Sequence, residues 1–248
     1  MADSPPAASA NPATGANPGA GADPVAPAGA LPVRPGFWHR PAGRVCGLGL
    51  SLLLVVLVGL WGYFYFDGAL GNNIHQVDPD PQALYRTAQL SGPTLAAVVK
   101  EDHIRTVLNL RGANPGKSWY DTESHTLAAL GVKEIDIHMS GKHMPTREAL
   151  VTLVTALESA ERPIMVHCAW GSDRTGLACA LDRLIKHPGD YTAARAELAF
   201  FPYGHTGHFG YEAMDHVVDQ FERYQAGGGK LDLAAWAAQV YQPEANAN

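Results

Sequence analysis

Residues 167–176 constrain the fold of this chain more than any other segment. They read His-Cys-Ala-Trp-Gly-Ser-Asp-Arg-Thr-Gly. The four residues before them, 163–166, are apolar and partly β-branched, which predicts a buried strand, while residues 175–184 carry helical periodicity. The segment therefore predicts a strand, a tight loop and a helix in direct succession.

The rest of the chain extends this alternation. Further strands are expected at 83–89, 106–110 and 132–137, and helices at 93–101, 119–130, 146–160, 191–199, 211–224 and 231–241. Alternating strands and helices predict an α/β layered domain, in which helices flank a central, mostly parallel sheet. The loop after residue 167 would then lie at the carboxyl ends of the strands, where α/β domains bind ligands.

Residues 168–174, which we call the cradle loop, combine groups that bind and attack phosphate. The five residues between Cys168 and Arg174 allow backbone N–H groups to converge, and the following helix adds its positive N-terminal end. Such a field stabilises a thiolate, which would make Cys168 a nucleophile. Arg174 offers a planar fork for two phosphate oxygens. Thr175 can hydrogen-bond the sulfur, and Gly171 and Gly176 permit the tight backbone.

The pattern His167-Cys168, five residues, then Arg174-Thr175-Gly176 resembles the signature of the cysteine-dependent protein tyrosine and dual-specificity phosphatase superfamily. The resemblance extends over about residues 83–224. It is closest to the compact, atypical dual-specificity phosphatases of bacteria, plants and fungi, which have a strand some sixty residues before the loop. It implies that Cys168 and Arg174 are catalytic and that His167 and Gly176 support the loop. The implied substrate-binding residues are Ala169, Trp170, Gly171, Ser172, Asp173, Arg174 and Thr175.

The mechanism of that superfamily also requires a general acid. In many relatives it is an aspartate about thirty residues before the cysteine, but no aspartate lies in the corresponding loop here, and Asp136 alternates with isoleucines as in a strand. Asp173 directly precedes the cradle arginine, an arrangement similar to myotubularins and some secreted bacterial tyrosine phosphatases, where that aspartate is the acid. Asp173 is therefore the leading candidate, and Asp136, His138 and His143 are the remaining ones.

Three further features could shape the substrate site. Arg111 ends a predicted strand, so it either reaches the cradle loop or caps a surface turn. The aromatic and glycine-rich segment 200–209 resembles loops that pack beside the cradle in compact phosphatases, and simple packing is the other reading of it. Trp170 stands where many relatives have a basic residue, which argues against a highly charged inositol polyphosphate as substrate.

The resemblance implies no cofactor and no metal. Paired histidines such as His205 and His208 lack the cysteines or carboxylates that would complete a metal site. The three cysteines, Cys46, Cys168 and Cys179, give no disulfide framework, and Cys179 is expected in the core.

Residues 45–66 form an uncharged apolar stretch that is long enough to cross a bilayer as a helix. Trp61, Tyr63 and Tyr65 gather at its C-terminal end, as interfacial aromatics do. A cleaved signal peptide would have an apolar core of only about 7 to 15 residues and a small-residue cleavage site. We therefore expect an uncleaved, single-pass transmembrane anchor.

The charges on either side of this stretch predict its orientation. Three arginines precede it and three aspartates follow it: Arg34, Arg40 and Arg44, then Asp67, Asp78 and Asp80. By the positive-inside rule the N-terminus would stay in the cytoplasm. The protein would then lie in a bacterial inner membrane, with the catalytic domain in the periplasm.

Composition divides the chain further. Residues 1–36 are rich in alanine, proline and glycine and are expected to be a disordered tail. The remaining predicted parts are a linker at 67–82, a phosphatase domain at 83–224, and a C-terminal helix and tail at 225–248. The formal net charge of −6 argues against a nucleic-acid partner.

Three functions remain open at this point. The first is a membrane-anchored phosphatase of phosphotyrosine or of phosphoserine and phosphothreonine in proteins. The second is a phosphatase of a phospholipid head group or another small phosphate near the membrane. The third is a phosphate-binding module without catalysis. The sequence gives no oligomeric state.

Overall fold

The structure is a computed structural model of the whole chain, and it describes residues 42–63, 71–79, 83–208 and 210–243. The chain divides into two units, residues 1–47 and 48–248, and the sheet domain lies in the second. The tail predicted at 1–36 lies outside the described residues.

Helix α1 spans Ala42–Tyr63 and covers most of the stretch predicted to be a membrane anchor. Among the residues that the structure describes, no helix combines the length and the apolar character needed to cross a membrane. Residues 64–66 of the predicted anchor lie outside the described residues, and the transmembrane anchor predicted at 45–66 is not shown.

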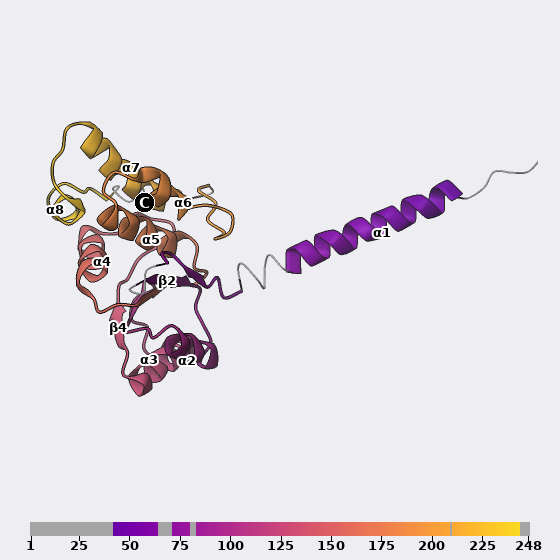
Figure 1. Cartoon of the computed structure of the whole chain (residues 1–248), viewed down its shortest axis with the longest axis horizontal. Coiled ribbons are helices and arrows are strands. Elements are labelled where there is room, and N and C mark those ends of the chain that lie inside the picture. The colour runs from indigo at the N-terminus through magenta and orange to yellow at the C-terminus, as the bar shows by residue number, and fades with distance from the viewer. Residues whose placement is uncertain (1–41, 64–70, 80–82, 209, 244–248) are drawn as a thin grey trace, which may run out of the picture. The chain divides into compact units, whose positions relative to one another are not determined.

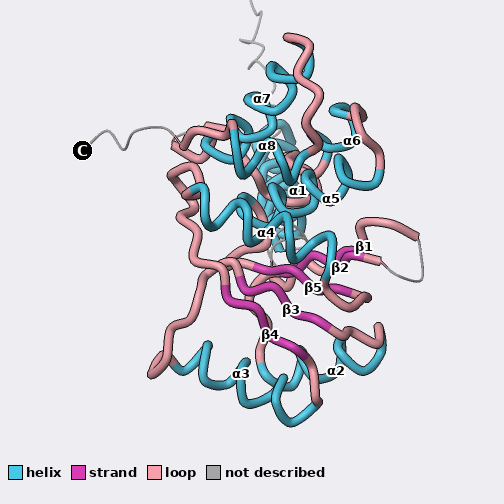
Figure 2. Tube along the Cα trace, turned by 90° about the vertical axis from the view of Figure 1, so that its left-hand side faces the viewer, coloured by secondary structure: helices cyan, strands magenta, loops and turns pink. Residues whose placement is uncertain are grey.

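A five-stranded sheet forms the centre of the domain, with the strand order β1-β2-β5-β3-β4 (Figure 2). The strands are β1 (His75–Gln76), β2 (Leu84–Thr87), β3 (Thr106–Asn109), β4 (Lys133–Asp136) and β5 (Ile164–His167). β1 pairs antiparallel with β2, and the other pairs are parallel. The predicted α/β fold with a mostly parallel sheet is confirmed.

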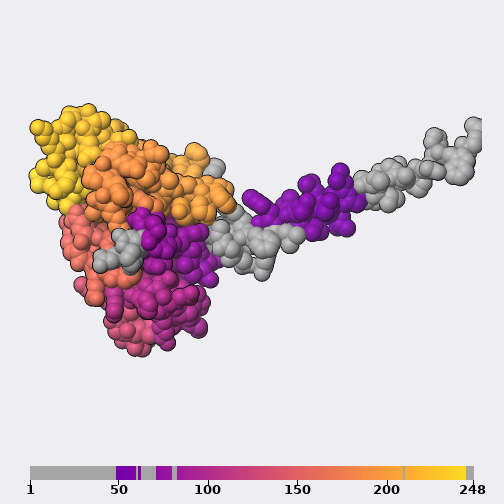
Figure 3. All heavy atoms as spheres, in the orientation of Figure 1, coloured from indigo at the N-terminus to yellow at the C-terminus, as the bar shows by residue number. Residues whose placement is uncertain are grey.

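Helices cover both faces of this sheet (Figures 1 and 2). On one face lie α2 (Gly92–Glu101) and α3 (Ser118–Leu130). The other face is covered by α4 (Arg147–Ser159), α5 (Asp173–Lys186), α6 (Tyr191–Ala196), α7 (Ala213–Ala226) and α8 (Leu233–Gln239). The space-filling view shows the segment of α2 and α3, in magenta, at one end of the domain and its last helices, in yellow, at the other (Figure 3).

Alternation along the strands explains these two layers. In the central strands, Val107 and Met165 pack into the cluster beneath α2 and α3, whereas Leu108 and Val166 pack into the larger cluster beneath the other helices. Successive side chains of a strand point to opposite faces, so apolar strands build a core on each side. The sheet is therefore buried from both faces.

The helix ends follow from local residues. Ser91 caps α2 by accepting a hydrogen bond from the Thr94 N–H at 3.4 Å, and Thr146 caps α4 in the same way. Gly131 ends α3 in the left-handed conformation, with φ 68°. The strand and helix limits predicted from the sequence agree with these elements to within a few residues.

The structure adds parts at both ends of the predicted domain. β1 lies inside the predicted linker at 67–82, yet it pairs with β2. Helix α8 lies in the predicted C-terminal segment, and its Trp236, together with Tyr241, is fully buried in the larger core cluster. The segment after residue 224 is thus part of the packed domain.

Candidate active site

The cradle loop follows the central strand of the sheet. β5 is buried along its whole length and has β2 on one side and β3 on the other, both parallel to it. The carboxyl ends of all three strands therefore meet at one edge, and Cys168 is the first residue beyond β5. Its side chain is a free thiol in a residue that is only 2 % exposed.

Two glycines fix the shape of the loop. Gly171 has φ +72°, and a Cβ there would lie 2.8 Å from the backbone of Thr87 and Ala88. A Cβ on Gly176 would lie 2.8 Å from the Glu197 carbonyl oxygen. Both distances are shorter than real Cβ contacts, so the loop and the first turn of α5 require glycine at these positions.

A buried arginine, Arg86 of β2, holds the cradle loop from outside. Its Nη2 donates to the carbonyl oxygens of Gly171 at 3.0 Å and Ser172 at 3.5 Å. Its Nη1 donates to the backbone oxygen and the carboxylate of Glu197, both at 2.9 Å, and the guanidinium lies 3.5 Å over the ring of Tyr203. Because the C=O and N–H of one peptide point in opposite directions, carbonyls turned toward Arg86 turn the next N–H groups away from it.

Arg174 is held at the open side of the loop. Its Nη1 donates to the Met139 oxygen at 3.1 Å and the Leu110 oxygen at 3.4 Å, at the ends of two strands. Its Nε is buried without a hydrogen-bond partner among the described residues, which leaves a donor for an anion. The Thr175 hydroxyl is also buried and has no partner there, so the expected bond to the Cys168 sulfur is not formed.

His167 leads a buried polar chain that the sequence did not predict. Its Nε2 lies 3.1 Å from Glu123 Oε1, and its Nδ1 lies 3.3 Å from the Cys168 oxygen. Glu123 accepts a hydrogen bond from Gln89, whose Oε1 accepts from Arg111 Nη1 at 2.9 Å. His167 thus contacts Glu123 without a hydrogen bond between them, and hydrogen bonds continue from Glu123 through Gln89 to Arg111.

Arg111 lies near the cradle, as one of the two sequence interpretations expected. Its guanidinium stacks 3.4 Å over the ring of Trp119. Burial and the nearby charge of Arg174 lower the pKa of Arg111, while Cys168 and Glu123 act in the opposite direction. Its charge therefore adds to that of Arg174 near the cradle loop.

Asp136, another candidate for the acid, has both carboxylate oxygens bound outside the cradle loop. Its Oδ1 accepts from Asn109 Nδ2 at 2.7 Å and its Oδ2 accepts from Tyr120 at 2.6 Å, so both oxygens are used. It ends the edge strand β4, with β3 between it and β5. Neither His138 nor His143 forms a hydrogen bond to the cradle loop among the described residues. His138 Nδ1 lies 3.3 Å from the Arg111 oxygen, and His143 is exposed.

Asp173, the leading candidate, is the first residue of α5 and directly adjoins Arg174. Its Oδ1 lies 2.7 Å from Nδ1 of His205, and Nε2 of that histidine lies 2.8 Å from Asp215 Oδ2. His205 belongs to the aromatic and glycine-rich segment 200–209. The structure thus brings that segment against the cradle, as one interpretation of the sequence expected.

A cavity of about 380 Å³ opens beside Asp173. Its lining residues come from three parts of the chain: Gly71, Trp170, Ser172, Asp173, Gly204, Thr206 and Tyr211. Asn73, which is fully buried, joins two of these parts because its amide donates to the Trp170 oxygen at 3.0 Å and to the Tyr203 oxygen at 3.1 Å. The cavity therefore has a fixed wall next to the phosphate cradle.

Two sequence predictions remain: one places Cys179 in the core, and the other concerns metal binding by paired histidines. Cys179 is fully buried, and burial raises the pKa of its thiol, as suits a core residue. Within the described part of the chain, no group of three or more metal-ligating side chains has the arrangement of a metal site.

Comparison with known proteins places this geometry in a family. A family model described as "DSP-PTPase phosphatase fused to NAD+ Kinase" matches residues 67–199, which is more than half of the chain. No curated protein sequence matches.

Solved structures share the fold. A mutant form of Tk-PTP is 13% identical over 62% of this chain and 96% of its own, with a TM-score of 0.50. TpbA of P. aeruginosa is 21% identical over 63% and 92%, with a TM-score of 0.48, and PTPMT1 is 15% identical over 63% and 99%, also at 0.48. TpbA has also been solved with pTyr and PTPMT1 with PI(5)P. With its family match, its layered fold and its cysteine-arginine loop, this chain belongs to the DSP-PTPase phosphatase family.

Proposed function

We propose that this protein hydrolyses phosphate monoesters through a phosphocysteine intermediate, with phosphotyrosine or phosphoserine and phosphothreonine of proteins as substrates. One observation carries the proposal. Cys168 and Arg174 lie at the two ends of a loop whose peptides are turned by Arg86, at the N-terminus of α5. Converging N–H groups and a helix N-terminus bind the oxygens of a phosphate, and the nucleophile lies beneath them.

The reaction follows from these positions. The Cys168 sulfur bonds to phosphorus as the bond from phosphorus to the ester oxygen breaks. Asp173 gives its proton to that oxygen, and the alcohol or phenol leaves. A water then attacks the phosphorus of the phosphocysteine and gives a proton to Asp173, which releases inorganic phosphate and restores the thiolate. Arg174 and Arg111 offset the negative charge of the phosphoryl group throughout.

The cavity beside Asp173 favours an aromatic leaving group. Its volume of about 380 Å³ and its wall residues Trp170 and Tyr211 suit a phenyl ring that extends away from the phosphate. Asp173 lies in the same wall, where the ester oxygen of such a substrate would be. This supports phosphotyrosine ahead of phosphoserine and phosphothreonine.

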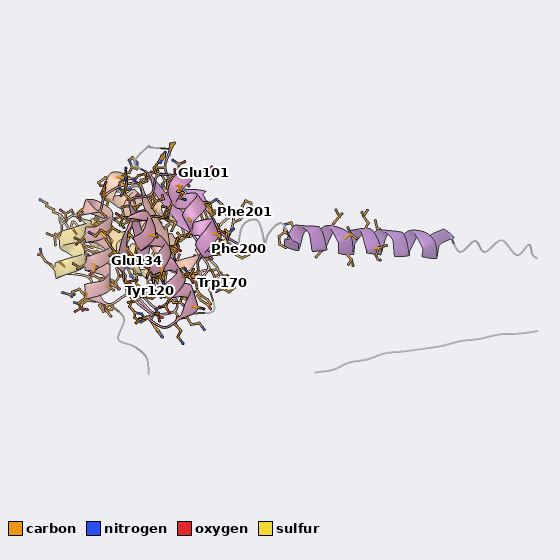
Figure 4. All side chains as sticks on the ribbon, turned by 90° about the horizontal axis from the view of Figure 1, so that it is seen from below. Glu101, Tyr120, Glu134, Trp170, Phe200 and Phe201 are labelled. Atoms are coloured by element: carbon orange, nitrogen blue, oxygen red, sulfur yellow. The ribbon has the colours of Figure 1, made fainter. Side chains whose placement is uncertain are left out.

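A lipid head group or another small amphiphilic phosphate is the second candidate. Three exposed aromatic side chains favour it: Trp170, Phe200 and Phe201, which Figure 4 shows on the same side of the domain. Trp170 is 69 % exposed although it belongs to the cradle loop. Exposed aromatics next to a phosphate site could contact the apolar part of an amphiphile.

Phosphate release by the full chain tests the two substrate classes. The substrates are peptides carrying phosphotyrosine, phosphoserine or phosphothreonine, and a phosphatidylinositol phosphate in detergent micelles. We expect the highest kcat/KM with the phosphotyrosine peptide, and a preference for the lipid would favour the second candidate. Acid quenching during turnover should trap a chain that is heavier by one phosphoryl group on Cys168.

Two cysteine variants decide whether the chain is an enzyme at all. Cys168→Ser should lose all measurable turnover, because a hydroxyl is a much weaker nucleophile than a thiolate. Cys179→Ala, a change at the buried cysteine of α5, should keep turnover within about threefold of the wild type. If Cys168→Ser keeps full turnover, the phosphocysteine mechanism is wrong, whereas a wild type without turnover on any of these substrates would favour the non-catalytic binding module.

The cellular location stays a proposal from the sequence. The uncharged stretch at 45–66, with arginines before it and aspartates after it, supports an inner-membrane protein whose catalytic domain is periplasmic. Protease added to spheroplasts should then digest the domain. A domain that resists protease until the spheroplasts are lysed would contradict this location.

A further inference from the structure

A buried histidine lies between two carboxylates next to the cradle loop. His205 is only 2 % exposed, and each of its ring nitrogens lies within 2.8 Å of a carboxylate oxygen, one from Asp173 and one from Asp215. Neutral imidazole has only one N–H and would direct a lone pair at one of the two carboxylates. Two such short contacts therefore indicate an imidazolium that donates to both.

The charges around this ring agree with the geometry. Burial by itself lowers the pKa of His205, but the hydrogen bonds and negative charges of Asp173 and Asp215 outweigh it and raise the pKa to about 9. Asp173 faces the ring from α5 and Asp215 faces it from α7. The imidazolium is thus the form present at neutral pH.

The histidine restrains the residue that carries the proposed acid role. Asp173 lines the cavity and adjoins Arg174, and its Oδ1 is the oxygen bound to His205. Its Oδ2 has no hydrogen bond to another described residue, so this oxygen remains for the leaving group. One oxygen is fixed by His205 while the residue itself lines the cavity, which is the arrangement a positioned general acid needs.

We infer that His205 is a positioning residue which, anchored by Asp215, holds Asp173 toward the ester oxygen of the substrate. The inference rests on the proposed phosphatase function. Beside this imidazolium the resting Asp173 is a carboxylate, so the proton comes with a phosphate monoester that binds as the monoanion. Oδ2 takes up this proton and gives it to the leaving oxygen, and the N–H of His205 stabilises the carboxylate that forms again. The proton of His205 itself stays on the ring. When water attacks the phosphocysteine, the same carboxylate takes up the proton.

Leaving-group dependence tests this role in the full chain. In His205→Gln the charge is lost and Asp173 is no longer fixed. We expect kcat/KM for phenyl phosphate, which reports the step in which the leaving group departs and needs a proton, to fall about 100-fold. The loss for para-nitrophenyl phosphate should be less than about fivefold, because para-nitrophenolate leaves without a proton. A merely structural histidine would lower both rates by the same factor.

A second variant tests the contact between Asp215 and His205 without removing the histidine. Asp215→Asn keeps an oxygen acceptor for Nε2 but removes one negative charge, which lowers the pKa of His205. In the wild type, kcat for phenyl phosphate should fall as the pH rises through about 9, when the ring loses its proton. In Asp215→Asn this fall should begin at a lower pH.

Asp219→Asn is the matched control, because Asp219 lies one turn further along α7 and pairs with Arg195 instead. It should keep both the leaving-group dependence and the pH profile of the wild type. Equal losses on both substrates in His205→Gln, or an unchanged pH profile in Asp215→Asn, would overturn the inference. A wild type that hydrolyses neither substrate would instead refute the proposed function, and the inference with it.

Discussion

Replacing Arg86 by methionine should lower both Tm and kcat, and the loss of kcat should be larger than the lost stability explains. Arg86 is fully buried and donates to Gly171, Ser172 and Glu197. Removing one member of a buried ion pair costs about 3 to 5 kcal/mol. Glu197 keeps a second partner, Arg183, at 3.2 Å, so we expect the lower figure, about 3 kcal/mol. For a chain of this size that corresponds to a fall in Tm of roughly 6–12 °C.

The catalytic loss should exceed what this instability explains. Without Arg86 the peptides after Gly171 and Ser172 are free to rotate, and the cradle loses the fixed direction of at least one N–H donor. Loss of one such donor costs about 100-fold to 1,000-fold in kcat. We therefore expect kcat for para-nitrophenyl phosphate to fall about 100-fold in Arg86→Met, measured well below the melting temperature of the variant.

Arg183→Met is the matched control for this prediction. Arg183 belongs to the same ion-pair cluster and contacts Glu197, Asp78 and the Val77 oxygen, but it does not touch the cradle loop. It should lower the melting temperature and leave kcat within about threefold of the wild type. If Arg86→Met keeps the wild-type kcat, or if Arg183→Met loses as much, Arg86 does not orient the loop.

Three further predictions concern the loop, its neighbour Arg111 and pH. Gly171→Ala should abolish activity and lower Tm, because the new Cβ would lie 2.8 Å from the backbone of Thr87. Gly116→Ala is the control: Gly116 has a similar φ but open space around it, so this variant should keep activity. Arg111→Lys loses the stacked, planar fork and should raise KM about tenfold in a steady-state assay. Burial, followed by the charges of neighbouring acids, raises the pKa of Glu134 from 4.5 to about 7. The protonated form of Glu134 therefore stabilises the fold, and Tm should fall as the pH rises from 4.5 through 7. Glu134→Gln should remove this fall, and an unchanged pH dependence of Tm would refute the assignment.

The local features of the site could be predicted from the sequence. Cys168, Arg174 and the two glycines lie within nine residues, and the strand before them and the helix after them have clear periodicities. The order of short segments was therefore enough to place Cys168 and Arg174 at the edge of a parallel sheet. Asp173 could be named for the same reason, since it is part of the loop.

The supporting residues could not be predicted, because their partners are far away in the sequence. Arg86 bonds the loop across 85 residues, and Asn73 bonds Trp170 across 97 and Tyr203 across 130. The surroundings of Asp136 could not be predicted either. Its alternation correctly indicated a strand, but no local pattern shows that this strand is at the edge of the sheet, where Asn109 and Tyr120 occupy its carboxylate.

Three contacts join the cradle loop to the segment after α6. Asn73 bridges the oxygens of Trp170 and Tyr203, Arg86 bonds Gly171 while it stacks on Tyr203, and His205 bonds Asp173. Each contact joins a residue of 170–173 to a residue of 203–205, so the cavity wall and the cradle loop are held as one piece. An acid carried by a separate loop must be brought to the substrate by closure of that loop. The acid proposed here is already fixed beside the arginine, so the proposed reaction needs no aspartate in the more distant loop.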